Sequence, residues 1–385
     1  MLSTEGRTAR ALIVAGEASG DLYGAALVRA LGEQAPGLEF VGIGGAEMEK
    51  AGVRLLARSA QLGVVGYVEL AGSLRYIAEA YWRARGVLRA ERPALAIFID
   101  YPDFNLRLCR VARGAGVPVL YYISPQVWAW RRWRVRTIAR VVDRMLVAFP
   151  FEVPFYQQAG VPVEFVGHPL LDLAVPTLSR EDFFRTVGLD PSRPLLALAP
   201  GSRRAEVARL LPLVAEAARR LQVRDPHLQV LVAPASTVDP QQLQQAVAAS
   251  ALEARVIAGC TYDILAHADA AIVASGTVTL EAALLGVPMV VVYRLSPLTY
   301  GLVRPFIHVR HIALPNLIAG RRVVPELIQG AATPGRLAAA TARLLDDPEA
   351  RTAMRKDLGT VRGALGGPGA TARAAAAART MLRIG

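Results

Sequence analysis

Residues 11–24 read Ala-Leu-Ile-Val-Ala-Gly-Glu-Ala-Ser-Gly-Asp-Leu-Tyr-Gly. The apolar run at 11–15 leads directly into a glycine-containing loop, where Ser19 is a candidate helix N-cap and Asp21 suits a first helical turn. The order strand, loop, helix is typical of a parallel α/β sheet. The glycines do not match the dinucleotide pattern G-x-G-x-x-G, which disfavours a nicotinamide enzyme. A well-capped helix start explains this loop about as well as a ligand site does.

The same alternation of short apolar runs with helical stretches continues along the chain and pauses where prolines cluster between His168 and Pro194. We therefore predict an α/β fold with two Rossmann-like domains facing a cleft. Their bounds are residues 1–170 and 171–365, followed by a C-terminal helix at 366–385 that packs back on the first domain. The predicted strands are 11–15, 40–43, 95–99, 117–123, 145–148 and 163–166, then 195–199, 229–232, 255–258, 270–273 and 289–292.

Composition narrows the class of protein. Of 385 residues 53% are hydrophobic and 6% aromatic, which favours a large aliphatic interior over disorder. The net charge of +12 implies an anionic partner: nucleic acid, phosphorylated metabolites or an anionic membrane face. The apolar runs are too short for a secretory signal or a spanning helix.

The two cysteines and five histidines lack the spacing of a disulfide framework or a metal site. No D-x-D triplet occurs, so a metal-dependent sugar-nucleotide site of that kind is unsupported. We predict no metal and no cofactor, and the cysteine usage favours a reducing, cytoplasmic compartment.

Polar residues that follow the predicted strands are the candidates for chemistry, because the carboxyl ends of parallel strands line the ligand crevice of such folds. Asp100 ends the run at 95–99, and Asp103 lies at the start of the next helix. Asp103 is explained equally well as a first-turn acid. A carboxylate at a strand end is costly to bury without a partner, so Asp100 is the better candidate for a general base.

Residues 121–136 hold three of the four tryptophans and four arginines. Interleaved aromatic and cationic side chains suit nucleic-acid stacking, a lipid interface or a phosphate pocket. A solvated basic helix with core tryptophans fits the spacing equally well.

Two turns in the second half are suited to anions. Residues 200–206 and 274–281 each follow a predicted strand and open a helix, whose N-terminus attracts negative charge. Arg203 adds a guanidinium to the first turn. In the second, Gly276 permits close backbone approach, and Glu281 is placed to accept ribose hydroxyls. Two such turns in one domain favour nucleotide binding.

Together these segments resemble the lipid-A-disaccharide synthase family over nearly the whole chain. The matching residues, in order, are 14–21, 99–100 with 102–105, 124–125 with 127–130, 167–169, 200–203 with 206, 275–277 with 281, and 314–317 with 325–326 and 329. The chain departs from the family pattern at Tyr101, where alanine is usual, and at Val65, where methionine is common.

The resemblance implies a GT-B glycosyltransferase that inverts the anomeric centre without a metal. It condenses UDP-2,3-diacylglucosamine with 2,3-diacylglucosamine 1-phosphate into a β-1,6-linked disaccharide and UDP, in lipid A biosynthesis. The partners it implies are these two lipids and an anionic membrane surface, not nucleic acid. A homo-oligomer is compatible with it, and the expected location is the cytoplasmic face of the inner membrane.

By this resemblance each domain holds one substrate. The catalytic residues implied are Asp100 and Asp103. The residues expected to bind UDP are Gly201, Ser202, Arg203, Ser275, Gly276, Thr277, Glu281, Asn316 and Glu326. Those expected around the acceptor are Glu17, Ser19, Gly20, Asn105, Trp128, Trp130 and Arg131.

Two alternatives stay open on the sequence. Another GT-B protein, such as a UDP-N-acetylglucosamine epimerase or the peptidoglycan N-acetylglucosaminyltransferase, shares many of the same features. A non-catalytic basic module that binds nucleic acid or membrane is the alternative from another class, and the two anion-suited turns argue against it.

Overall fold

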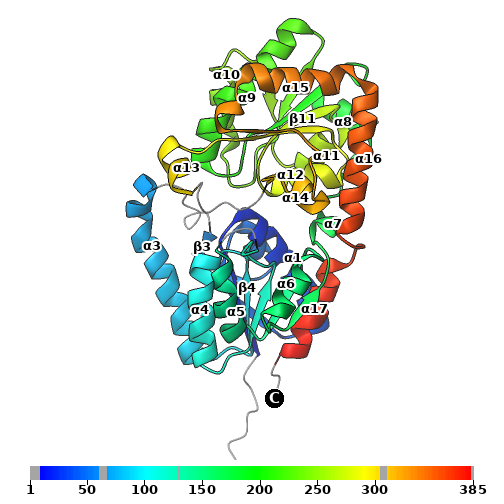
Figure 1. Cartoon of the computed structure of the whole chain (residues 1–385). Helices are drawn as coiled ribbons and strands as arrows, with labels where there is room; N and C mark the ends of the chain where they lie inside the picture. The colour runs from blue at the N-terminus through cyan, green and yellow to red at the C-terminus, as the bar shows by residue number, and fades with distance from the viewer. Residues whose placement is uncertain (1–8, 60–66, 129–130, 304–309, 383–385) are drawn as a thin grey trace, which may run out of the picture. The chain divides into compact units, whose positions relative to one another are not determined.

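The computed structural model describes residues 9–59, 67–128, 131–303 and 310–382, and it divides into two compact units. Unit 1 contains Met1–Asp172 and Gly367–Gly385, and unit 2 contains Leu173–Pro305 and Val309–Gly366. Each unit is built on one parallel sheet with helices packed against it (Figure 1). The predicted α/β fold with two Rossmann-like halves is confirmed.

The sheet of unit 1 has seven strands in the order β3-β2-β1-β4-β5-β6-β7. The order reverses between β1 and β4, which pair in parallel with Ala15 beside Ile99. Connections leave these two strands toward opposite faces, so a crevice opens beyond their carboxyl ends. The strands are β1 Arg10–Ala15, β2 Glu39–Gly44, β3 Arg54–Arg58, β4 Leu95–Ile99, β5 Val119–Tyr122, β6 Arg144–Val147 and β7 Val163–Phe165.

Helices bury the central strands of this sheet almost completely, as the continuous apolar runs require. Helices α3, α4 and α5 pack next to one another, and α1 packs against α17 (Figure 1). The helices are α1 Ala18–Gln34, α2 Ala46–Lys50, α3 Tyr67–Gly86 with the π-helical turn η2 Val87–Glu91, α4 Pro102–Gly114, the 3₁₀ turn η3 Arg132–Arg134, α5 Val135–Val141, α6 Glu152–Gln158, α7 Leu170–Leu173 and α17 Ala370–Met381.

The C-terminal helix α17 belongs to unit 1 through specific contacts. The Asp172 carboxylate accepts hydrogen bonds from the backbone N–H groups of Gly369, at 2.5 Å, and Thr371, at 3.1 Å, where the helix begins. The Arg373 guanidinium donates to the Val166 carbonyl at 2.9 Å. These polar contacts fix the start of a helix whose buried face consists of alanines, which allow close approach to α1.

Unit 2 repeats the architecture with six strands in the order β10-β9-β8-β11-β12-β13, and its order reverses between β8 and β11. Its strands are β8 Leu195–Ala199, β9 Gln229–Val232, β10 Arg255–Val256, β11 Ala270–Ala274, β12 Met289–Tyr293 and β13 Glu326–Ile328. Its helices are α8 Arg180–Val187, α9 Arg204–Arg224, α10 Pro240–Ala248, α11 Thr261–His267, α12 Thr277–Leu284, α13 Pro297–Val303, α14 Leu314–Ala319, the 3₁₀ turn η5 Gln329–Ala331, α15 Pro334–Asp346 and α16 Pro348–Ala364.

The structure corrects the predicted helix start after β1. Glu17, not Ser19, is the N-cap residue of α1, and Ser19 lies inside the helix. Asp21 does lie in the first turn, but its buried carboxylate reaches another element. It accepts hydrogen bonds from the backbone N–H groups of Gly45, Glu47 and Met48, and so caps the short helix α2. This contact joins the first two βα units across 24 or more positions of sequence.

Candidate active site

The loops that follow β1 and β4 touch each other. Gly16 lies against the ring of Tyr101, and a Cβ atom on Gly16 would overlap that ring. Glu17, half-buried, comes next and is the N-cap residue of α1. Since β1 and β4 are neighbours, Glu17 and Asp100 both lie beyond the carboxyl ends of these strands, at one edge of the sheet.

Asp100 occupies an unusual backbone conformation. Asp100 and Tyr101 are both left-handed, with φ of 43° and 47°, a region that non-glycine residues rarely adopt. Asn105, a fully buried residue near the start of α4, holds this left-handed backbone in place. Its Nδ2 donates to the carbonyls of Ile99 at 3.1 Å and of Asp100 at 2.8 Å. The Tyr121 hydroxyl also donates to the Asp100 carbonyl. Asn105 therefore acts on the backbone that presents Asp100.

Asp103 is engaged differently. Its side chain is 63% exposed and forms ion pairs with Arg131, at 3.2 Å, and with the buried Arg134. These contacts fasten the 131–134 turn to the start of α4. The structure thus gives Asp103 and Arg131 a shared role in joining two elements. Trp130 lies outside the described residues.

A buried carboxylate that the sequence analysis missed lies under the neighbouring loop. Glu152 accepts hydrogen bonds from Ser124 Oγ at 2.8 Å, Trp128 Nε1 at 3.1 Å and the Phe149 backbone N–H at 3.1 Å. Burial raises the pKa of Glu152 to about 7, although these hydrogen bonds oppose the shift. Like Asp100, Glu152 follows the carboxyl end of a strand, β6, and that position was the signal available in the sequence. It fixes Trp128 at the loop after β5.

In unit 2 the loop after β8 is tied down by its own side chains. Gly201 has φ of +128°, and the Ser202 backbone N–H donates to the Glu206 carboxylate at 3.0 Å. The Thr237 hydroxyl donates to the Ser202 carbonyl. Arg203, half-buried, is the N-cap residue of α9. The backbone of this loop is therefore fixed around the predicted arginine.

The loop after β11 lies beside it, because β8 and β11 are paired. Gly276, with φ of 154°, is the N-cap residue of α12, and Thr277 is the first residue of that helix. Ser275 precedes them and is fixed by its backbone N–H, which donates to the Val292 carbonyl at 3.0 Å. One turn into α12, Glu281 faces the Tyr262 hydroxyl at 3.5 Å, and burial of its carboxyl raises its pKa to about 7.

Asn316 and Glu326 are parts of one buried network. Asn316 is fully buried, accepts from the backbone N–H groups of Val323 and Val324, and donates to Glu326 Oε1 at 2.8 Å. Glu326 Oε1 also accepts from the Ala313 N–H at 2.9 Å. Asn316 thus ties α14 to residues 323–326, and Glu326 holds the backbone at the start of that helix. Their contact with a donor stays a prediction.

The predicted acceptor residues also differ in access. Gly20 is buried, with Ala15 and Ile99 close to where a Cβ would lie, so it serves close packing of α1 on the sheet. Ser19 and Trp128 are half-buried. The structure therefore gathers Glu17 and Asp100 at the β1/β4 edge, and residues 201–203 and 275–277 at the β8/β11 edge. Val65 lies outside the described residues.

Comparison with known proteins gives one family. The lipid-A-disaccharide synthetase family model matches residues 11–380. Lipid-A-disaccharide synthase from Geobacter sulfurreducens is 50% identical over 379 residues, covering 98% of this chain and 99% of the relative. The enzyme of that name from Myxococcus xanthus is 44% identical over 377 residues, covering 98% of each.

Solved structures share the fold at low identity. A putative UDP-N-acetylglucosamine 2-epimerase from Listeria monocytogenes superposes with a TM-score of 0.66 at 14% identity, covering 98% of this chain and 97% of its own. The calicheamicin glycosyltransferase CalG4 gives a TM-score of 0.57 at 19% identity, covering 98% and 100%. At these identities the likeness concerns the fold alone.

The buried Glu152 predicts a pH dependence of stability. Its folded pKa of about 7 lies above its ordinary value of 4.5, so between these values the folded state binds more protons than the unfolded state. The free energy of unfolding of the wild type should therefore fall, relative to Glu152→Gln, by about 2–3 kcal/mol as the pH rises from 4.5 to 7. Urea unfolding across this range measures the difference.

The matched control is Glu33→Gln, at an exposed position of α1. This variant also removes one carboxylate but leaves the buried site untouched. If Glu152→Gln differs from the wild type by the same amount at every pH, the burial of the Glu152 carboxyl is contradicted.

Proposed function

Because this chain belongs to the lipid-A-disaccharide synthetase family, we propose that unit 1 holds the acceptor and supplies the general base, and that unit 2 holds UDP. The chain is a glycosyltransferase of lipid A biosynthesis. It condenses UDP-2,3-diacylglucosamine with 2,3-diacylglucosamine 1-phosphate into the lipid A disaccharide 1-phosphate and UDP. Identity of 50% over almost the whole chain favours this activity over epimerisation, for which the likeness is at the level of fold.

Asp100 is the proposed base. An acceptor hydroxyl is a weak nucleophile until its proton is removed, and a carboxylate within hydrogen-bond reach can take that proton. The hydroxyl oxygen then bonds to the anomeric carbon, the bond from that carbon to the diphosphate breaks on the opposite face, and the configuration inverts. The observation that supports this assignment is the left-handed turn at Asp100–Tyr101, because backbone strain of this kind clusters at functional sites.

UDP is the proposed ligand of the β8/β11 edge. Negative charge grows on the diphosphate as it leaves, and Arg203 together with the N-terminus of α12 would stabilise it. The Glu281 carboxyl, one turn further along, is the proposed partner of the ribose hydroxyls. The fixed loops at Gly201 and Gly276 support the proposal, since preorganised donors need little rearrangement.

An anionic membrane surface is the proposed setting. In the described part of the chain no helix is both long enough and apolar enough to cross a bilayer. Acylated substrates and the net charge of +12 support peripheral association with the cytoplasmic face of the inner membrane. Trp133, within the 131–134 turn, has 65% of its surface exposed and suits such an interface.

The donor assignment predicts a loss of UDP affinity in two variants. Arg203→Ala removes a charged hydrogen-bond donor and should weaken UDP binding about 10-fold or more, and Glu281→Ala should weaken it by a similar factor. Arg204→Ala removes an exposed arginine one position along α9 and is the matched control, expected to change affinity by less than threefold. Isothermal titration calorimetry with UDP decides. If all three variants bind UDP as the wild type does, the nucleotide does not occupy this edge.

The base assignment predicts that Asp100→Asn lowers turnover about 10²–10⁴-fold at saturating donor, because the amide keeps the shape but accepts no proton. Asp103→Asn should retain most turnover and lose stability, since it weakens the ion pairs to Arg131 and Arg134. Product formation by mass spectrometry and thermal melting are measured for both variants. Near-normal turnover in Asp100→Asn together with its loss in Asp103→Asn would reverse the two roles.

A further inference from the structure

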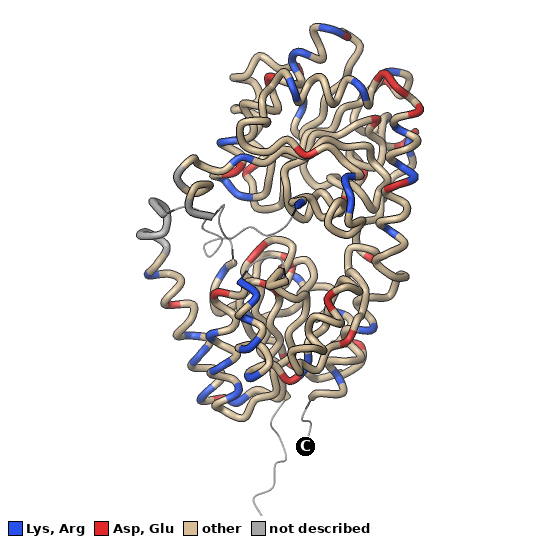
Figure 2. Tube along the Cα trace, viewed as in Figure 1, with Lys and Arg blue, Asp and Glu red and all other residues tan. Residues whose placement is uncertain are grey.

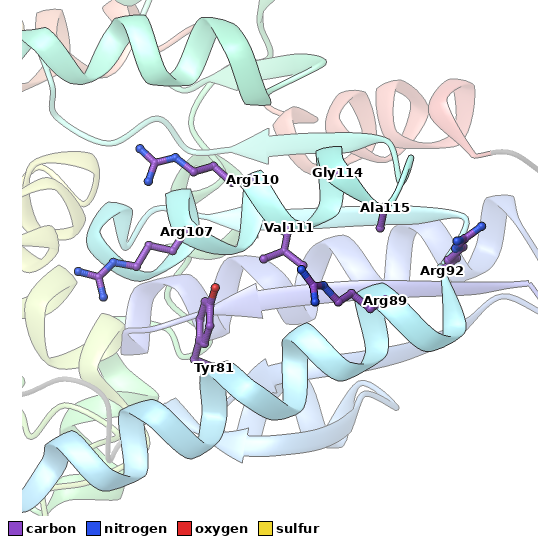
Figure 3. A pocket seen from close by; sticks show the side chains of 8 residues that line it. All are labelled: Tyr81, Arg89, Arg92, Arg107, Arg110, Val111, Gly114 and Ala115. Atoms are coloured by element: carbon purple, nitrogen blue, oxygen red, sulfur yellow. The ribbon is translucent and has the colours of Figure 1, made fainter.

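A groove of about 650 Å³ lies in unit 1 between α4 and the end of α3 with its η2 turn. Two pairs of arginines line it, Arg89 and Arg92 from the η2 side and Arg107 and Arg110 from α4, with Tyr81 and Val111 between them (Figure 3). The arginines are exposed. The groove is therefore basic and open rather than an enclosed pocket.

These four arginines lack carboxylate partners within the part of the chain that the structure describes. Neighbouring cations are paired: Arg83 with Glu79 and Arg113 with Asp143. Arg107 and Arg110 are three positions apart on one helix, a spacing at which like charges repel. Attraction to the carboxyl end of α4 accounts for a cation in its last turn, but not for Arg107 in the middle of the helix.

The groove is separate from the proposed reaction site. Asp100 and Asp103 lie where α4 begins, beyond the carboxyl end of β4. The groove extends to Arg92, which precedes β4, and to Ala115, which follows the end of α4. In Figure 2, lysine and arginine positions, drawn in blue, gather at the bottom left of the view, where Figure 1 shows the lower ends of α3 and α4. These charges therefore serve neither the base nor the nucleotide.

We propose that this arginine groove binds the phosphate groups of anionic phospholipids in a membrane surface. The inference rests on the peripheral membrane association proposed above. Guanidinium groups pair with phosphate oxygens in a bidentate manner. Exposed arginines gain little from a single soluble phosphate, because solvent screens each pair. A lipid surface presents many phosphates at once, and the contributions of several arginines then add.

The neighbouring side chain supports a lipid occupant. Trp82, on α3 beside the groove residue Tyr81, is 58% exposed, and the Arg85 guanidinium lies 4.5 Å from the centre of its ring. An exposed indole over a cation is suited to the level of lipid headgroups, where one end is apolar and the other wet.

The test uses two double variants of the full chain, Arg89→Gln with Arg92→Gln, and Arg107→Gln with Arg110→Gln. The matched control is Arg336→Gln with Arg355→Gln, two exposed arginines of unit 2 whose loss changes the net charge equally. Partitioning onto vesicles of phosphatidylglycerol and phosphatidylcholine is measured at low salt, beside vesicles of phosphatidylcholine alone. Each arginine strengthens binding about fivefold, so each groove variant should bind the anionic vesicles about 30-fold more weakly. The control should change by less than threefold.

Groove variants that bind as the control does would overturn the inference. Inorganic phosphate and chloride are also compared as competitors at equal ionic strength. If phosphate displaces the wild type from the vesicles and chloride does not, the groove binds a soluble anion and the inference is overturned. If the wild-type protein does not bind anionic vesicles, both the proposed membrane association and the proposed role of the groove are overturned. Turnover with detergent-dispersed substrates is measured in the same variants and should stay unchanged in both groove variants. This assay does not depend on vesicle binding, so it tests the proposed glycosyltransferase site separately from the groove.

Discussion

The left-handed turn at Asp100–Tyr101 is the constraint on which the proposed site in unit 1 depends. Two consecutive non-glycine residues in this conformation cost about 1–3 kcal/mol each, so other contacts must hold them there. Asn105 does so from inside the protein, by hydrogen bonds to two successive carbonyls at the end of β4. The ring of Tyr101, turned by the same conformation, lies against Gly16 and joins the β1 loop to the β4 loop. One turn of backbone thus sets the position of Asp100 and brings the two loops into contact.

In both units, the polar side chains that hold the backbone differ from those assigned to the substrates. Buried polar side chains hold backbone segments or other side chains, as Asp21 holds α2, Glu152 holds Trp128 and Asn316 holds residues 323–324. The residues to which we assign the substrates, Glu17 and Asp100 in unit 1 and Arg203 and Glu281 in unit 2, are half-buried and follow the adjacent strands. Because a buried unsatisfied group is costly, the holding residues have little freedom to do chemistry. The proposed chemistry therefore falls on the less buried set.

The sequence predicted the fold well where burial alone determines the structure. Central strands such as β4 and β8 are continuous apolar runs, and their bounds were predicted to the residue. The edge strands β3 and β13 were missed, because neither is a continuous buried apolar run. Strand β3 carries arginines at both ends, and β13 is only three residues long, all of them half-buried. Ser19 was predicted as the N-cap from the local sequence pattern alone, whereas α1 begins at Ala18 with Glu17 as its N-cap residue. Glu152 follows β6, a position that could have drawn attention to it, but its pairing with Ser124, 28 positions away, is one that no local pattern predicts.

The central claim is that Asp100 removes the proton of the attacking hydroxyl. The most direct measurement is a crystal structure of the Asp100→Asn variant with UDP and the 2,3-diacylglucosamine 1-phosphate acceptor bound. The account predicts the residue 100 side chain within about 2.6–3.2 Å of the hydroxyl that becomes the glycosidic oxygen, with Asp103 still paired to Arg131 and Arg134. An acceptor hydroxyl that lies instead against Asp103, with residue 100 turned away from it, would contradict the account.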